Sequence, residues 1–433
     1  MRPALLITLC TGMFLVQLDV TVVTVALPAL GEHLHAGVGA LQWVVDGYSV
    51  VLAALLLTGG ALGDVLGHRG VVLTGFAVFG AASAACGLAQ SAPWLVAARA
   101  VQGVGAALLL PGTLAVINRE CPDRRTRARA LGIWAGVSAL ALPAGPLLGG
   151  ALVAVAGWRP VFLINAPIVA AATIAIRKLV APGVRKPGCV DLPGAATAAL
   201  GLGSGVYAVI GRQPVAVIPA VLAAAAFVLI EHRSADPMLP LGLLRSRRTA
   251  GANAISAAMN FAGLGSILVF TLYLQRVLNF PPPVAGLAML PLFLTPALLG
   301  PLSGRLAAKF GTRPPIVAGL LLGAVGLFAL LRAGTTGYAT VLPALLGLGA
   351  GLGLLTAAVV TAAVDGVPAE RAGIAGGVNN AARQAAGALG VAVFGAVAGD
   401  PAHAGTFVHG LHLLGAAAGA LWLAAAVLAV RTT

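Results

Sequence analysis

The chain has 433 residues, of which 59% are apolar and only 9% are charged. Soluble domains carry about a quarter charged residues, so this composition excludes a soluble globular protein and makes lipid the main solvent. The apolar runs are continuous rather than alternating, which favours spanning helices over a membrane barrel. The formal net charge of +14 comes from basic residues in short loops between those runs. Because these residues form no continuous patch, nucleic acid is not an expected partner.

Apolar runs of about 17–25 residues predict fourteen membrane-spanning helices and an all-α integral membrane fold. In chain order, the predicted spans are 5–27, 41–62, 71–90, 94–117, 130–153, 160–177, 192–210, 215–231, 250–273, 283–303, 314–332, 338–361, 373–397 and 409–430. The first run has no clear small-residue cleavage site, so we interpret it as an uncleaved span rather than a signal peptide. An even number of spans places both termini on the same side of the membrane.

Basic residues indicate which side that is. With the N-terminus in the cytoplasm, the inner loops hold Arg119, Arg124, Arg125, Arg127, Arg129, Arg177, Lys178, Arg185, Lys186, Arg233, Arg245, Arg247 and Arg248. The outer loops then hold Arg159, Arg212, Arg276 and Arg332. The positive-inside rule therefore predicts that both termini are cytoplasmic. The preference for Arg over Lys, with heavy use of Ala and Gly, points to the inner membrane of a high-GC bacterium.

The cysteines and histidines predict no metal site, since His33 and His35 sit in a predicted external loop without further ligands. Cys10, Cys86, Cys121 and Cys189 lack metal-ligand spacing, and two of them lie in loops that we place in the reducing cytosol, so we expect no disulfide. The sequence contains no GxxxxGK[ST] phosphate-binding loop. We therefore expect no cofactor, and an ion gradient rather than ATP as the energy source.

An internal repeat predicts two related halves. The segment from Gly60 to Arg69 follows the second span, and a partial copy from Gly304 to Arg313 follows the tenth. Duplicated halves are typical of alternating-access transporters. We predict an N-terminal six-helix half over 1–178, two extra helices within 179–235, and a C-terminal six-helix half over 236–433.

Three charged residues interrupt the apolar runs of the N-terminal half: Asp19, Asp46 and Arg99. A charge near the centre of a spanning helix costs roughly 2.5–3.5 kcal/mol, and it persists where it faces a cavity, a partner or a moving ion. At about 1.5 Å per residue, all three fall roughly 8–13 Å below the outer surface. Gln102 lies one turn from Arg99 on the same face and is expected to join them.

Two carboxylates and a guanidinium at one level suit proton coupling. Desolvation disfavours a charged carboxylate and a nearby arginine favours it, so moving the arginine changes whether the proton is held or released. The competing interpretation of the cluster is a fixed Asp–Arg ion pair that only holds helices together. For Asp46, which lies near a predicted helix end, a solvated role similar to a helix cap is the alternative.

Glycine and proline concentrate in the fourth and fifth spans. The positions concerned are Gly103, Gly105, Gly145, Pro146, Gly149 and Gly150. Small residues allow helices to approach closely, and proline loosens the backbone ladder. Ordinary close packing explains part of this pattern. A kinked, sliding interface that gates a cavity is the functional interpretation.

Further polar or aromatic residues within the spans are candidates for lining a substrate cavity. They are Trp43, Tyr48, Asn165, Asn260, Tyr273, Gln275, Asn380 and Arg383. Among them, Asn380 and Arg383 share one helical face with Gly376 and Gly387.

Several motifs resemble those of the major facilitator superfamily, in particular the fourteen-span drug:proton antiporters of the QacA/EmrB-like group. Residues 18–28 are similar to that group's first-helix motif, residues 99–105 to its fourth-helix motif, and residues 132–150 to its antiporter motif. The loop with Gly60, Asp64, Gly67 and Arg69 resembles the superfamily's cytoplasmic signature. Residues 158–167 and 273–275 also look like family segments.

The resemblance implies a major facilitator fold and a monomeric, proton-coupled exporter of amphipathic small molecules. It implies that Asp19 carries the proton or the substrate, that Arg99 modulates it and Asp46 assists, and that Asp64 and Arg69 stabilise one conformation across the halves. The predicted spans nine to fourteen contain no carboxylate, whereas some relatives that expel dications have one there, so the resemblance does not extend to dicationic substrates. An importer of a small metabolite and a non-transporting membrane sensor or scaffold are the alternative functions. No nucleophile–base pair points to an enzyme.

Overall fold

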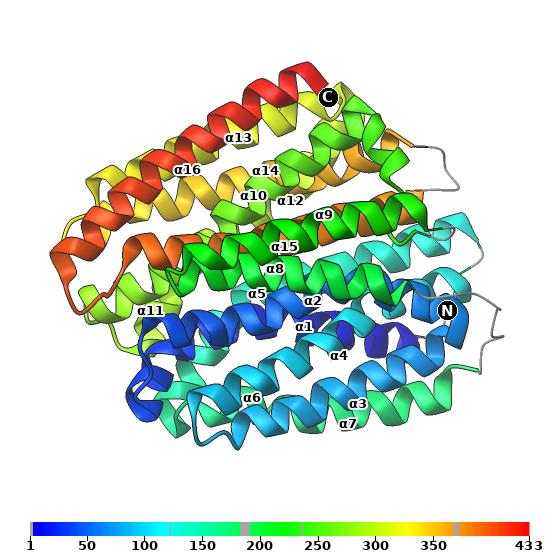
Figure 1. The fold of residues 1–433 in the computed structure, drawn as a ribbon, viewed down its shortest axis with the longest axis horizontal. Helices are drawn as coiled ribbons and strands as arrows, with labels where there is room; N and C mark the ends of the chain where they lie inside the picture. The colour runs from blue at the N-terminus through cyan, green and yellow to red at the C-terminus, as the bar shows by residue number, and fades with distance from the viewer. Residues whose placement is uncertain (1–2, 122, 182–190, 235–236, 368–371, 433) are drawn as a thin grey trace. The chain divides into compact units, whose positions relative to one another are not determined.

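The computed structural model describes residues 3–121, 123–181, 191–234, 237–367 and 372–432. Within them, fourteen helical segments are long and apolar enough to cross a membrane, which confirms the predicted all-α membrane fold (Figure 1). Three residues used in the predictions lie outside the described residues. They are Cys189, for which we expect no disulfide, and Arg185 and Lys186, which we place in a cytoplasmic loop.

The α-helices are α1 (Pro3–Leu34), α2 (Val38–Leu66), α3 (His68–Gly87), α4 (Ala92–Glu120), α5 (Arg124–Ala156), α6 (Arg159–Leu163), α7 (Asn165–Leu179), α8 (Leu192–Ile210), α9 (Val217–Arg233), α10 (Arg247–Leu272), α11 (Pro282–Ala288), α12 (Leu290–Phe310), α13 (Arg313–Ala329), α14 (Leu342–Asp365), α15 (Ala372–Ala398) and α16 (Ala404–Thr432). Short 3₁₀ turns lie at η1 (Pro214–Ala216), η2 (Leu241–Arg245), η4 (Leu330–Arg332) and η5 (Tyr338–Thr340), and η3 (Tyr273–Val277) is a π-helical turn that continues α10.

Two predicted spans are each built from two helices. The sixth span is divided at Ile164 into α6 and α7, and the tenth is divided at Met289 into α11 and α12. Pro167 follows the first break and Pro291 the second. Proline has no N–H and clashes with the preceding turn, so a continuous hydrogen-bond ladder is interrupted near it.

The internal repeat reappears as a shared turn geometry. Gly67 joins α2 to α3 with φ of 91°, and Gly311 joins α12 to α13 with φ of 84°. Only glycine adopts this left-handed region without strain. The two copies of the repeated segment therefore use the same residue type for the same backbone requirement.

The chain forms two compact units, one of residues 1–205 and 215–238 and the other of residues 206–214 and 239–433. In the first unit, α4 packs against α2 and α3, and α1 packs against α5. In the second unit, α10 packs against α15, and α13 packs against α14 and α16. The predicted three-part division, with boundaries near residues 178 and 235, stays a prediction.

Candidate functional site

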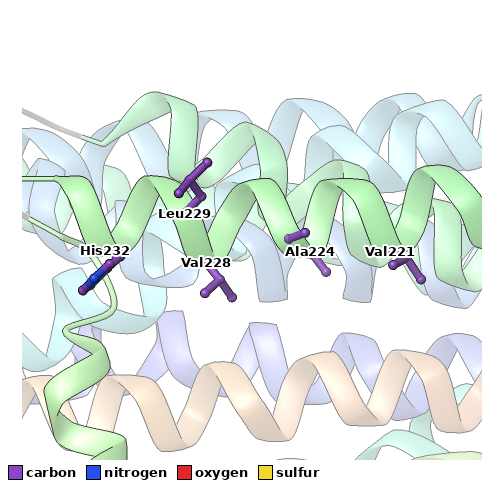
Figure 2. A pocket seen from close by; sticks show the side chains of 6 residues that line it. Val221, Ala224, Val228, Leu229 and His232 are labelled. Atoms are coloured by element: carbon purple, nitrogen blue, oxygen red, sulfur yellow. The ribbon is translucent and has the colours of Figure 1, made fainter.

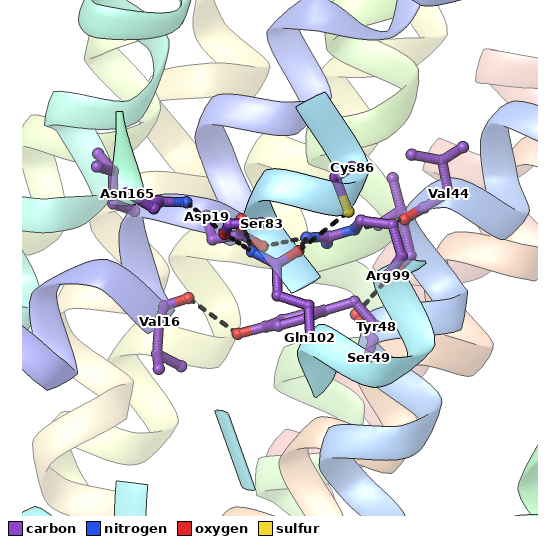
Figure 3. Close-up of polar contacts among 12 residues, drawn as sticks. Val16, Asp19, Val44, Tyr48, Ser49, Ser83, Cys86, Arg99, Gln102 and Asn165 are labelled. Atoms are coloured by element: carbon purple, nitrogen blue, oxygen red, sulfur yellow. Dashed lines mark hydrogen bonds and ion pairs between the residues drawn. The ribbon is translucent and has the colours of Figure 1, made fainter. Parts of the chain in front are cut away.

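Arg99 of α4 lies in the interior of the first unit and is paired with a carboxylate of α1 (Figure 3). Its Nη1 forms an ion pair with Asp19 Oδ2, and both side chains are 1% exposed or less. The same Nη1 donates to Gln102 Oε1 at 2.7 Å, and Nε donates to the carbonyl of Val44 on α2 at 2.9 Å. One guanidinium thus connects α4 to both α1 and α2.

Gln102 extends this network to α3 and α7. Its Nε2 donates to Asp19 Oδ1 at 2.9 Å and to Ser83 Oγ at 2.8 Å, and Asn165 Nδ2 donates to the same Ser83 Oγ at 3.0 Å. We refer to Asp19, Ser83, Arg99, Gln102 and Asn165 as the buried polar cluster. Charge-assisted hydrogen bonds are the strong ones, so the cluster ties together four helices of this unit around one carboxylate.

Aromatic rings form the apolar wall beside Arg99. The Arg99 guanidinium carbon lies 4.3 Å from the ring centroid of Tyr48 and 6.0 Å from that of Phe162. Tyr48 is fully buried, and its hydroxyl donates to the carbonyl of Val16 on α1 at 3.2 Å. The ring faces stabilise a desolvated cation, so Tyr48 contributes to the environment of Arg99 as well as to packing.

Asp46 is the exception among the predicted charged residues. It lies within α2, its side chain is 0% exposed, and neither carboxyl oxygen has a hydrogen-bond partner among the described residues. The solvated, cap-like alternative for Asp46 is therefore wrong, because the helix begins well before it at Val38. A buried polar group without a partner is costly, so packing stability does not explain a carboxyl group at this position.

The glycines of α4 and α5 allow close approach between helices. A Cβ on Gly103 would lie 2.6 Å from the Tyr48 carbonyl oxygen, and one on Gly105 would lie 2.6 Å from the Phe79 nitrogen. On α5, a Cβ at Gly149 would lie 2.9 Å from the Val22 carbonyl oxygen. Gly145 likewise meets Thr21 and Val22, and Gly150 is buried in the same helix. The α1 residues at this interface, Thr21 and Val22, thus follow Asp19 by two and three positions.

Arg69, at the start of α3, forms a hydrogen bond within the first unit. Arg69 Nη2 donates to the carbonyl of Arg177, in the last turn of α7, at 2.9 Å. Gly60 is looser than the other motif glycines, because a Cβ there would lie 3.7 Å from Pro111 Cβ. The side chain of Asp64 is not among those described, so its role with Arg69 in stabilising one conformation stays a prediction.

The candidates of the second unit separate into different places. Arg383 Nε of α15 approaches Asn260 Oδ1 of α10 at 3.4 Å, and Asn380 is half-buried one turn away. Tyr273 is fully buried and donates to the carbonyl of Gly334 at 2.7 Å, away from that pair. Gln275 lies in the π-helical turn η3, a distortion common at functional sites. In the first unit, Trp43 is half-buried on α2.

Sequence reasoning missed several small polar residues. Ser83 and Cys86 of α3 both contact Gln102, the thiol at 3.8 Å. In the second unit, Asn379 Nδ2 donates to Asn253 Oδ1 at 3.1 Å and to Ser256 Oγ at 2.9 Å. The usable signal was spacing: polar residues at positions 253, 256 and 260 of α10 recur every three or four residues, which predicts one polar helix face.

A shallow hollow also runs along α9 (Figure 2). The residues that line it are Val221, Ala224, Ala225, Val228, Leu229 and His232. All six come from one helix, and all but the histidine are apolar. This surface has the character of a lipid-facing helix face, and we place no charge chemistry there.

Fourteen apolar helical segments and a buried ion pair in an intramembrane network define a polytopic membrane protein with the character of a transporter. Residues 9–391 match the Major Facilitator Superfamily, and the chain belongs to that family. This confirms the family expected from the motifs, and it is a family of transporters rather than enzymes.

Curated relatives cover most of the chain. It is 36% identical to the multidrug resistance protein Stp of Mycobacterium tuberculosis, over 92% of this chain and 76% of that protein. It is 35% identical to the tetracenomycin C resistance and export protein of Streptomyces glaucescens, over 90% of this chain and 74% of that protein. It is also 35% identical to the methylenomycin A resistance protein of Streptomyces coelicolor, over 90% of this chain and 84% of that protein.

A solved structure supports the fold. The crystal structure of the peptide transporter POT in complex with sulfate superimposes with a TM-score of 0.73 and covers 100% of this chain and 95% of that chain. The sequence identity is 16%, so the similarity concerns the fold alone.

Proposed function

We propose that this protein exports amphipathic small molecules, drugs or antibiotics among them, in exchange for protons. The names of its relatives support this, because they describe multidrug resistance, antibiotic resistance and antibiotic export. The distribution of basic loop residues supports cytoplasmic termini in a bacterial inner membrane. The protein is proposed to work as a monomer, since the two related halves supply both sides of an alternating-access cycle.

The observation that carries the proton-coupling part is the pairing of Asp19 with Arg99 inside the buried polar cluster. A buried ion pair is weak evidence for stability, because desolvation of both charges offsets much of their attraction. Its presence in a membrane span is better explained by a cycle in which one partner changes charge. Neutralising Asp19 would release Arg99 to its remaining contacts with Gln102 and the Val44 carbonyl.

Asp46 is proposed as the second proton site. A carboxylate with no partner in a buried position is far more costly than the neutral acid, so this conformation favours Asp19 as the ionised carboxyl and Asp46 as the neutral one. A conformation that admitted water to Asp46 would let its proton leave. Two carboxyls with opposite environments in one half provide the difference in charge state that coupling needs.

The glycines of α5 are proposed to permit the accompanying movement. Gly145 and Gly149 contact α1 at Thr21 and Val22, immediately after Asp19. Because glycine presents no side chain, α1 can shift along α5 without side-chain interlocking. A change of charge at Asp19 can therefore be transmitted as a displacement of α1.

The test is a susceptibility profile in an efflux-deficient bacterial host at matched expression. Wild type, Asp19→Asn and the control Asp400→Asn are compared against a panel of toxic compounds; Asp400 is an exposed loop carboxylate. We expect wild type and the control to protect against the same compounds, and Asp19→Asn to lose protection while still reaching the membrane. Wild-type protection by Asp19→Asn would refute the coupling role. Protection by none of the three would refute drug export.

A further inference from the structure

The second unit contains an intramembrane cation, Arg383, that forms no ion pair with a carboxylate among the described residues. Downstream of residue 238, the sequence has three acidic residues, Asp365, Glu370 and Asp400. Asp365 is the last residue of α14 and lies 3.7 Å from Arg248, Asp400 lies in an exposed loop, and Glu370 is outside the described residues. Asp365 is thus the terminal residue of its spanning segment, Tyr338–Asp365, and Asp400 lies between two segments, so neither is in the middle of a described span. Arg383, in contrast, lies in the middle of α15.

The contacts of Arg383 leave most of its hydrogen-bonding capacity unused. Its one contact, from Nε to Asn260 Oδ1 at 3.4 Å, is long for a hydrogen bond, and Nη1 and Nη2 have no partner among the described residues. Arg99, which lies within α4 in the first unit, has an ion pair and two further hydrogen bonds. The half-buried Arg383 therefore presents a charged fork that the described protein groups do not satisfy.

Neighbouring residues suit the binding of an anion. Asn380, three residues before Arg383 on α15, is half-buried and has no hydrogen-bond partner among the described residues. Gly376 lies one turn further back, and a Cβ there would still be 4.0 Å from Val364, so this face has room beside its polar groups. A guanidinium with adjacent carboxamides is well matched to the planar, two-oxygen geometry of carboxylates and to other oxyanions.

We propose that Arg383, with Asn260 and Asn380, binds the negative charge of the exported molecule, so that the substrates include amphipathic organic anions bearing a carboxylate, phenolate or sulfonate. This rests on the proposed export function and adds the charge class of its substrate. A purely structural role for Arg383 would use its contact with Asn260 to hold α10 against α15. That role leaves the two terminal nitrogens of the guanidinium unexplained.

The experiment uses everted membrane vesicles with an acidic interior and two dyes with a common xanthene core. Sulforhodamine B is an amphipathic sulfonate, and rhodamine 6G is a cation. The sulfonate remains charged at the working pH, so it does not follow the pH gradient passively and its accumulation reports the carrier. Wild type is compared with Arg383→Gln, with Arg383→Lys and with the control Arg332→Gln; Arg332 is exposed at the end of the turn η4, which follows α13.

We expect wild type and Arg332→Gln to accumulate sulforhodamine B, and Arg383→Gln to lower its initial rate about tenfold or more, as removal of one partner of a charge pair does. Arg383→Lys should retain an intermediate rate, and rhodamine 6G transport should not fall in Arg383→Gln. An equal loss of both dyes in Arg383→Gln would overturn the inference, since a structural or lipid-anchoring role affects every substrate. Transport of rhodamine 6G but not of sulforhodamine B by the wild type would also overturn the inference, and it would leave the proposed drug export intact.

If neither dye is carried, the susceptibility panel decides. Protection against acidic compounds that Arg383→Gln abolishes supports the inference. Protection confined to cationic or neutral compounds overturns it while leaving export intact. Protection against nothing refutes export itself, and the inference with it.

Discussion

Replacement of Arg99 by glutamine isolates the energetic role of the buried ion pair. Arg99→Gln removes the cation from Asp19 together with the hydrogen bonds to Gln102 and the Val44 carbonyl. Asp19 keeps one hydrogen bond, from Gln102 Nε2 at 2.9 Å. Removing one partner of a buried ion pair costs about 3–5 kcal/mol, because the other charge is left without compensation. We expect a loss of that size in the free energy of unfolding.

The double variant Asp19→Asn/Arg99→Gln provides the internal control. It removes both charges, so the unpaired carboxylate disappears and the loss should be smaller than for Arg99→Gln alone, although both substitutions are present. The interaction energy of such a cycle reports the pair itself. The assay is unfolding of the purified protein in mixed micelles with increasing SDS, followed by tryptophan fluorescence; Trp158 packs against Phe162 beside this cluster. Unchanged stability of Arg99→Gln, or a double variant as unstable as the sum of the single ones, would refute the argument.

Two further predictions concern Asp46 and the motif glycines. Asp46→Asn should abolish proton-coupled export and yet change the free energy of unfolding by less than about 1 kcal/mol, since no hydrogen bond is lost; a large destabilisation would show an unrecognised partner. Gly103→Ala should cost about 1–3 kcal/mol, as overpacking does, because its Cβ would lie 2.6 Å from the Tyr48 carbonyl oxygen. Gly60→Ala, with 3.7 Å to Pro111, is the matched control and should unfold like wild type in the same SDS titration.

The fold was predictable because its main signal is local. Each spanning helix is a long apolar run, and the fourteen runs of the sequence reappear as fourteen candidate spanning segments within the described part of the chain. The boundaries were less predictable. The first helix runs from Pro3 to Leu34 rather than over 5–27, because a helix continues beyond the hydrocarbon layer wherever its backbone hydrogen bonds can. The breaks at Ile164 and Met289 depend on how proline is accommodated in three dimensions.

The site was predictable where charge made it conspicuous. Asp19, Arg99 and Gln102 stood out in apolar runs and lie together in the structure. Ser83 did not stand out, since serine is common at ordinary helix contacts. Asp46 was expected at the same depth as Asp19, but depth follows from the rise per residue, whereas the direction of the side chain around α2 depends on how that helix packs. The sequence therefore places Asp46 near the pair without showing whether it joins the pair.

Arg99 and Arg383 together bear on the energetics of the proposed cycle. Arg99 is neutralised by Asp19, so the first unit can change its charge by taking up a proton. Arg383 is not neutralised by any described carboxylate, so the second unit is suited to gaining a negative charge with its substrate. If one proton enters as one monovalent anion leaves, the cycle moves a net two positive charges into the cell, because the outward movement of a negative charge is equivalent to the inward movement of a positive one. With about 2.3 kcal/mol per charge for each 100 mV, an inside-negative potential of that size contributes about 4.6 kcal/mol per cycle. Exchange of a proton for a monovalent cation would gain nothing from the potential. Under the proposed cycle, the potential therefore drives the export of an anion more strongly than the export of a cation.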